Sequence, residues 1–155
     1  MKKLMSTLFV IAAAAGIAMA ADKPDFSGNW KLDADKSVFG PMPPPTSLTA
    51  KIDHKDPDLS VVTTQSGAQG DRTDSMKYST DGKETTNSMM GSDVKSKAVW
   101  DGKILVITSN PNFGGAEMKL TNKYSLSDDG KTLTQALSIS GPQGDFDLTF
   151  VLVKQ

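Results

Sequence analysis

The stretch Ala116–Leu152, AEMKLTNKYSLSDDGKTLTQALSISGPQGDFDLTFVL, decides the fold class because apolar and polar residues alternate along most of it. A period of two is typical of β-strands, whose successive side chains point to opposite faces. One apolar and one polar face favour an antiparallel sheet that covers a core on one side. The side chains expected to face inward are Ala116, Met118, Leu120, Tyr124, Leu126, Leu133, Leu137, Ile139, Phe146, Leu148, Phe150 and Leu152.

Turn signals separate similar runs along the chain after Ala21. Asp-Gly-Lys occurs at residues 81–83, 101–103 and 129–131, and Asp-Gly between alternating runs predicts a tight turn because Gly tolerates positive φ. Clusters of Gly, Pro and Asp mark the remaining turns. We expect about ten strands, near residues 26–32, 47–54, 58–66, 71–79, 84–90, 93–100, 103–109, 116–126, 131–140 and 145–153.

The connections between these strands are short, so the predicted topology is an up-and-down antiparallel meander. A sheet of about ten strands must curl, and closure would remove its exposed edges. The sequence therefore predicts one all-β domain over residues 21–155, a closed or strongly curved β-barrel.

A Pro-rich segment, residues 36–46, interrupts the strand pattern. Pro43 to Pro45 cannot lie in a central strand, because proline lacks the backbone N–H that a ladder needs. The segment is either a rigid extended connector or a flap over one mouth of the barrel, with Phe39 and Met42 as its apolar contacts.

The N-terminal residues predict export. A basic start, Met1-Lys2-Lys3, precedes an apolar run from Leu8 to Met19, and Ala18 and Ala20 suit a cleavage site after residue 20. This run is too short for a spanning helix, which needs about 20 apolar residues. We expect residues 1–20 to be a signal peptide, and the mature bacterial protein to be periplasmic or secreted, with no membrane span.

The composition excludes several kinds of site. The chain has no Cys, which excludes a disulfide framework, a thiol nucleophile and a Cys-rich metal site. It has one His, which excludes any site that needs two histidines. Without residues 1–20, 15 basic and 18 acidic side chains remain, and this net charge of −3 argues against a nucleic-acid partner. No nucleophile elbow, phosphate loop or dinucleotide fingerprint occurs. We therefore expect no enzyme activity, cofactor or metal.

The single His54 lies in the polar segment Asp53–Asp58, DHKDPD. These oxygens and one imidazole could hold Ca²⁺ or Zn²⁺, but their spacing matches no recurring metal-binding loop. The interpretation that we favour for this segment is a solvated hairpin end.

The first expected strand carries a resemblance to a known family. Phe26-Ser27-Gly28-Asn29-Trp30-Lys31-Leu32 resembles the opening of lipocalins and fatty-acid-binding proteins, the calycin group, whose barrels begin with Gly-x-Trp. The run Trp30–Phe39 is similar to a motif of secreted bacterial proteins with lipocalin-like barrels. The resemblance implies a lipocalin-like barrel, and Trp30 is expected to plug one end of it with its large apolar area.

The chain departs from the calycin pattern in two ways. Calycins usually place an Arg of the last strand over this Trp, whereas the last strand here offers Lys154, which lacks a planar guanidinium. Fatty-acid-binding proteins hold the ligand carboxylate with an inward Arg and Tyr near the C-terminus, and no such pair occurs here. A fatty-acid site of that kind is therefore not expected.

The earlier strands mix Met and aromatic residues with polar ones. If Thr86, Ser88 and Met90 face inward, the barrel holds partly polar space for a small ligand; the alternative is a poorly packed or edge region. Arg72, the only Arg, either holds a ligand carboxylate, pairs with Asp74 or is simply exposed. The candidate ligand-binding residues of the lumen are Arg72, Met76, Tyr78, Met90, Trp100, Met118 and Tyr124.

These observations favour an exported, non-catalytic, lipocalin-like protein that binds a small apolar or amphipathic molecule. The alternative is a structural or protein-interaction β-barrel of the cell envelope without a small-molecule ligand. The stretch Ile104–Ile107 motivates this alternative, because it is apolar on both faces and a strand buried on one face need not be. The oligomeric state stays open.

Overall fold

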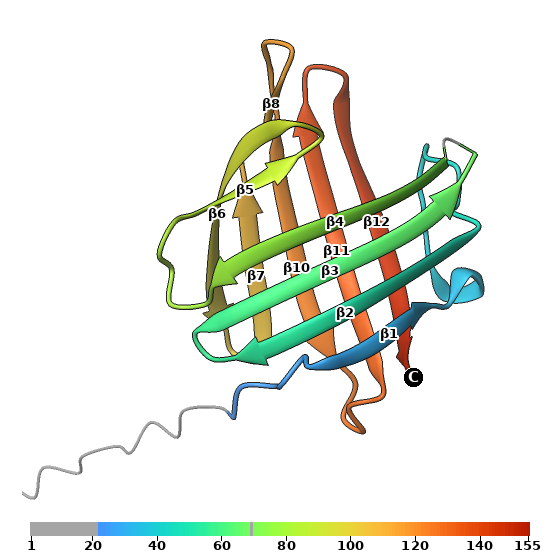
Figure 1. The fold of residues 1–155 in the computed structure, drawn as a ribbon, viewed down its shortest axis with the longest axis vertical. Helices are drawn as coiled ribbons and strands as arrows, with labels where there is room; N and C mark the ends of the chain where they lie inside the picture. Colours follow the sequence, from blue (N-terminus) through green and yellow to red (C-terminus); the bar gives the residue numbers. More distant parts are fainter. Residues whose placement is uncertain (1–21, 69) are drawn as a thin grey trace, which may run out of the picture.

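A computed structural model describes residues 22–68 and 70–155 (Figure 1), so the predicted signal peptide lies outside the described residues. Ten strands form one antiparallel sheet in which neighbours in sequence lie side by side. This arrangement confirms the predicted all-β meander. The order across the sheet is β4 (Gly70–Ser79), β3 (Asp58–Gly67), β2 (Ser47–Lys55), β1 (Gly28–Leu32), β12 (Gly144–Lys154), β11 (Thr132–Gly141), β10 (Lys119–Leu126), β7 (Ile104–Ser109), β6 (Ser92–Asp101) and β5 (Thr85–Met89).

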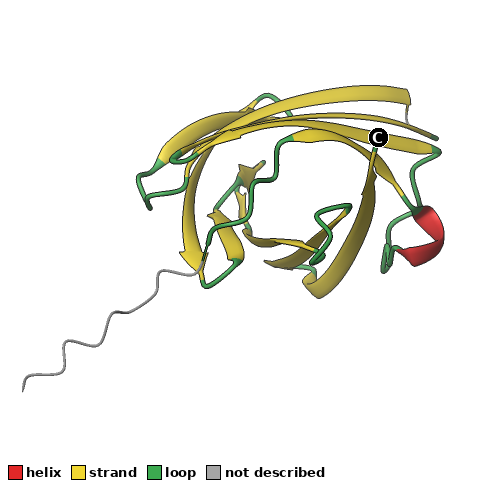
Figure 2. Cartoon of the chain, turned by 90° about the horizontal axis from the view of Figure 1, so that it is seen from below, coloured by secondary structure: helices red, strands yellow, loops and turns green. Residues whose placement is uncertain are grey.

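The sheet curls into a nearly closed barrel, which Figure 2 shows from below. The first and last strands pair with each other, with Trp30 opposite Lys154 and Leu32 opposite Leu152. The two remaining edges belong to β4 and β5, and no backbone ladder joins them within the described part of the chain. The barrel is therefore strongly curved, with one seam.

The predicted strand 116–126 is the one that the structure divides. It breaks at Met118 into β9 (Ala116–Glu117) and β10, and β9 pairs with β8 (Asn112–Phe113) in a small separate hairpin. The backbone N–H of Met118 donates to the carbonyl of the buried Pro111 at 2.9 Å, so this peptide leaves the ladder. Alternation alone does not reveal such a break, because the inward positions keep their spacing across it.

Trp30 plugs one end of the barrel. Its side chain is fully buried, and its Nε1–H donates to the carbonyl of Phe26 at 3.0 Å. The Nζ atom of Lys154 lies 5.4 Å from the ring centroid, where the calycin resemblance places an Arg. Gly28 makes room for this contact, because a Cβ there would lie 2.8 Å from Cε of Lys154. The sequence-based expectation for Trp30 is confirmed.

The inward face of β5 differs from the predicted one. The ladder places Asn87 opposite the buried Val94. The alternative in which Thr86, Ser88 and Met90 face inward is therefore wrong by one residue, and Met90 lies beyond β5, 71% exposed with a φ of 51°. A one-residue slip turns over every side chain of a strand, and this short polar strand has no apolar pattern that fixes its register. The residues that face inward are Thr85, Asn87 and Met89.

Asn87 bridges the seam between the two sheet edges. Its Oδ1 accepts the backbone N–H of Lys77 on β4 at 2.7 Å, and its Nδ2 donates to the carbonyl of Lys77 at 2.9 Å. One buried side-chain amide thus satisfies both backbone groups of an edge residue, as a partner strand would.

The Pro-rich segment folds against the barrel. A single 3₁₀ turn, Ala34–Lys36, precedes an isolated bridge between Val38 and Thr149 of β12. The Phe39 ring then meets the Phe150 ring edge-on, with the centroids 5.8 Å apart. The described residues contain no helix of the length and apolarity needed to cross a membrane.

Replacing Asn87 by Ala should lower the free energy of unfolding by about 1–2 kcal/mol, because two hydrogen bonds across the seam are lost. Urea unfolding measures the loss, and hydrogen exchange should show faster exchange at the amide of Lys77. Ser88→Ala is the matched control, since Ser88 is the exposed neighbour on the same strand. Equal effects of the two substitutions would contradict a bridging role.

Candidate functional site

The lower half of the barrel lumen, next to Trp30, is filled by its own side chains. The Phe26 ring stacks on Trp100 with centroids 5.8 Å apart and meets Tyr124 edge-on at the same distance. These rings fill the space next to Trp30. The buried apolar cluster consists of Phe26, Trp30, Leu48, Ala50, Ile52, Leu59, Val61, Ala98, Leu105, Ile107, Tyr124, Leu133 and Leu152.

The upper half of the lumen is more polar and only half-buried. On β3 and β4 the inward positions carry Thr63 opposite Asp74 and Gln65 opposite Arg72. On the far wall Asn122 lies opposite Leu137, and Gln135 lies opposite Phe150. These side chains are partly accessible, unlike the core below them. An open, partly polar wall above an apolar floor suits an amphipathic ligand.

Arg72 and Asp74 form a two-point ion pair on this wall. Nε of Arg72 lies 2.6 Å from Oδ2 of Asp74, and the Nη2 atom donates to Oδ1 at 2.8 Å. Among the sequence-based alternatives for Arg72, the structure has the internal pair. The guanidinium therefore already holds a carboxylate from this chain.

A hollow of about 190 Å³ lies beside this wall, between the Pro-rich segment and the inner face of the sheet. Phe39 and Met42 line it from the Pro-rich segment, and Leu148 and Phe150 line it from β12. Gln65 and the β3–β4 turn form its remaining side. The Pro-rich segment thus lines the hollow with both apolar residues that the flap alternative names.

The other predicted lumen residues lie at different depths. Met76 and Tyr124 are buried in the lower half, where burial raises the pKa of the Tyr124 hydroxyl. Burial likewise raises the pKa of Tyr78 to about 12, so this hydroxyl is neutral at physiological pH. Met118 lies at the top, against Gly141. A role of these residues in ligand binding stays a prediction, and Met90 lies outside the lumen.

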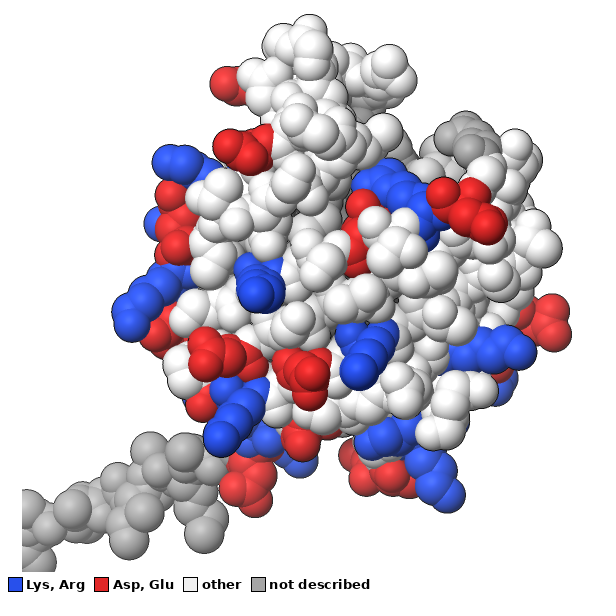
Figure 3. Space-filling model, viewed as in Figure 1, with Lys and Arg blue, Asp and Glu red and all other residues white. Residues whose placement is uncertain are grey.

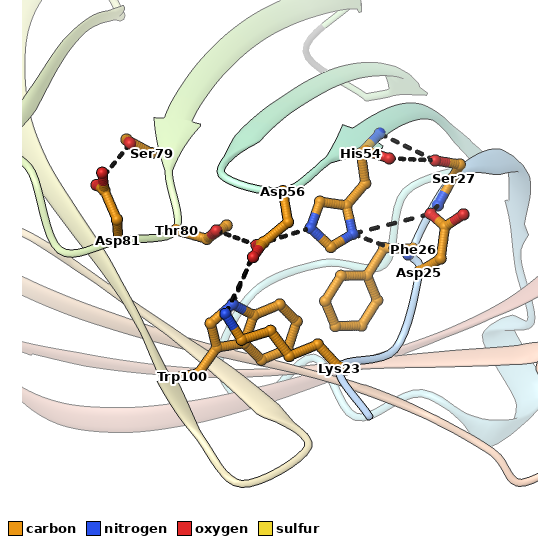
Figure 4. Close-up of polar contacts among 10 residues, drawn as sticks. All are labelled: Lys23, Asp25, Phe26, Ser27, His54, Asp56, Ser79, Thr80, Asp81 and Trp100. Atoms are coloured by element: carbon orange, nitrogen blue, oxygen red, sulfur yellow. Dashed lines mark hydrogen bonds and ion pairs between the residues drawn. The ribbon is translucent and has the colours of Figure 1, made fainter. Parts of the chain in front are cut away.

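Trp100 belongs to a polar cluster at the end of the barrel that Trp30 plugs, called the closed end below (Figure 4). Its Nε1–H donates to Oδ1 of Asp56 at 3.2 Å, and Lys23 pairs with Oδ2 of the same carboxylate at 3.0 Å. The hydroxyl of Thr80 also donates to Asp56. This hydroxyl above all, then Lys23 and Trp100, lowers the pKa of Asp56 to about 2. The cluster ties the N-terminal segment and β6 to the β2–β3 turn.

His54 is at the centre of this cluster rather than in solvent. Its side chain is only 4% exposed and stacks on Phe26 with centroids 5.5 Å apart. The backbone N–H of Phe26 donates to Nδ1 at 3.3 Å, and Nε2 lies 3.6 Å from Oδ1 of Asp56. The interpretation of this histidine as part of a solvated hairpin end is therefore wrong. Buried and exposed residues alternate along the strand Ser47–Lys55, and this alternation places the His54 ring on the inner face.

The part of the chain that the structure describes contains no group of three His, Cys, Asp or Glu side chains positioned to hold a metal ion. On the face in Figure 3, basic and acidic side chains are interspersed rather than gathered in patches of one sign. Such a face has no electrostatic footprint for nucleic acid.

Comparisons with solved structures agree with this architecture. The chain matches zebrafish ileal bile acid-binding protein in complex with cholic acid at 21% identity and a TM-score of 0.61, covering 84% of this chain and 98% of that one. A mutant of the REP1-NXSQ fatty acid transporter matches at 16% identity and a TM-score of 0.58, covering 84% and 98%. The fold is calycin-like. A secretory abundant heat soluble protein from Ramazzottius varieornatus matches at 14% and 0.59, covering 83% and 94%. No family model matches the chain, and no curated protein matches it.

Acid should weaken the closed end through Asp56. Its pKa of about 2 in the folded protein lies below the ordinary 3.8, so the unfolded chain binds this proton first as the pH falls. The stability that Asp56 contributes is complete above about pH 4 and is lost as the pH falls through about 2. Urea unfolding monitored by tryptophan fluorescence should find Asp56→Asn less stable than wild type at neutral pH, with the difference shrinking towards pH 2.

Asp58→Asn is the control for this experiment, because Asp58 is an exposed carboxylate of the same hairpin. It should leave the pH profile of stability close to that of wild type. A difference between wild type and Asp56→Asn that stays constant down to pH 2 would contradict the assigned role of the carboxylate.

Proposed function

We propose that the protein is an exported, non-catalytic barrel that binds a small apolar or amphipathic molecule in the upper half of its lumen. The observation that carries the proposal is the apolar hollow under the Pro-rich segment. It adjoins the half-buried lumen wall, because Gln65 belongs to both. Its volume of about 190 Å³ holds only part of a typical ligand, so the remainder would lie along the wall of Gln65 and Arg72.

Two further observations support this proposal. The zebrafish neighbour holds cholic acid and another neighbour is a fatty acid transporter, so barrels of this shape bind amphipathic molecules. Export rests on residues 1–20, which have the basic start, apolar run and small residues of a signal peptide. In a bacterium this would place the barrel in the periplasm or outside the cell.

A second candidate function is a structural or interaction barrel of the envelope. Val99 on β6 and Ile104 on β7 are 47% and 38% exposed on the outer face, and Val99 pairs with the half-buried Val106. This apolar outer strip favours a protein partner rather than a ligand. Crosslinking in the host envelope tests it, because a strictly monomeric barrel without a crosslinked partner would contradict it.

The flap should contribute directly to ligand affinity. Phe39→Ala removes an aromatic side chain from the hollow and should weaken binding of the neutral dye Nile red by about tenfold. Val38→Ala should change little, because Val38 lies on the same segment with 59% of its surface exposed. Fluorescence titration measures both affinities, and equal loss in the two variants would contradict a specific contact at Phe39.

Native mass spectrometry of the protein, purified gently from its source, tests the proposed function itself. A bound small molecule that is lost on denaturation is the expected result, and its mass would identify the class of cargo. A clean protein mass that does not shift when a lipid extract is added would contradict the proposal.

A further inference from the structure

The two charged side chains in the upper half of the lumen are paired with each other. Lys154, which covers Trp30, and His54 both lie at the opposite end of the barrel, next to Trp30. Above them, the inward positions of the described strands carry only two charged side chains, Arg72 and Asp74. The two side chains meet through contacts of 2.6 and 2.8 Å. Their opposite charges cancel, so the upper half of the lumen has no net charge.

The side chains around this pair are uncharged but polar. Thr63 and Gln65 lie beside it on β3, and Asn122 and Gln135 lie on the far wall. The Oδ1 atom of Asn122 is buried and accepts no hydrogen bond within the described structure. A wall of hydroxyl and amide groups recognises groups that donate and accept hydrogen bonds, and needs no ligand charge.

The lysines of the described strands, other than Lys154, lie on the outer face of the sheet. Lys77 on β4 and Lys123 on β10 are both exposed, and their ladder neighbours place them opposite to the inward pleat. Neither can reach a ligand carboxylate in the lumen without leaving its own face of the sheet.

We infer that the ligand of this barrel is an uncharged amphipathic molecule, with a hydroxyl, amide or ester head group on an apolar body. The inference rests on the proposed function and names the ligand class for the same site. A carboxylate ligand would either displace Asp74 from Arg72 or lie unpaired beside Asp74, and both arrangements cost desolvation and like-charge repulsion. A neutral head group pays neither cost and finds partners in the polar wall.

Two probes with the same acyl chain separate charge from apolar contact. Monoolein carries a neutral glycerol head group, and oleate carries a carboxylate. Titration of the purified protein, in competition with Nile red at neutral pH and below the micelle concentration, should give monoolein an affinity at least about tenfold higher than oleate. Equal affinities, or tighter binding of oleate, would overturn the inference while leaving the proposed function intact.

Asp74→Asn provides the converse test. The substitution frees the Arg72 guanidinium in place, so oleate should gain about tenfold or more in affinity relative to the wild-type protein. Asp71→Asn is the matched control, because Asp71 is exposed on the other face of the same strand and carries the same charge. It should leave the affinities for both probes unchanged.

The remaining outcomes are also decisive. An equal gain of oleate affinity in the Asp71 and Asp74 variants would mean that net charge, rather than the release of Arg72, governs selectivity, and would overturn the inference. Binding of neither probe by the wild-type protein, together with a clean native mass, would overturn the proposed function and the inference with it.

Discussion

The packing of Trp30 joins the first strand of the barrel to the last. The indole lies on the strand between β2 and β12, opposite Ala50 on one side and Lys154 on the other. Lys154 covers its ring, and its N–H donates a hydrogen bond to the backbone carbonyl of Phe26. The side chain therefore has neither an exposed face nor a free donor. Burial of a side chain of this size contributes about 1.5–3 kcal/mol, and here it also aligns the first strand with the last. The nearly closed shape follows from that alignment.

Much of the fold could be predicted from local patterns in the sequence. Gly102 and Gly130 have positive φ in the turns of the β6–β7 and β10–β11 hairpins, as the hairpin argument requires. Gly82 also has positive φ, but its turn connects β4 to β5, which do not pair within the described residues, so no hairpin forms there. Alternation in the late strands identifies the inward faces of β11 and β12 correctly, because large apolar residues on one face leave only one register that buries them. These signals are local, and a single sequence contains all of them.

The features that could not be predicted depend on long-range contacts. The sequence around His54 is typical of a polar loop, but the ring is buried by Phe26 and Trp100, which are distant in the sequence. The two bonds of Asn87 to Lys77 follow from how closely the sheet edges approach, which no local pattern encodes. The Arg72–Asp74 pair could be named from the sequence, as an alternative, since residues two apart on a strand share a face. Only the geometry of the pair decides between that alternative and a free anchor.

The seam between β4 and β5 gives the barrel a particular mechanical character. Elsewhere around the sheet, each pair of neighbouring strands is joined by a backbone ladder, which is shortest between β1 and β12, where residues 30–32 face residues 152–154. At the seam, widening stretches two bonds to one side chain. The barrel wall is therefore easiest to open along the seam. Opening there would move β4 and β5 apart while the strands on either side of β1 and β12 stay paired.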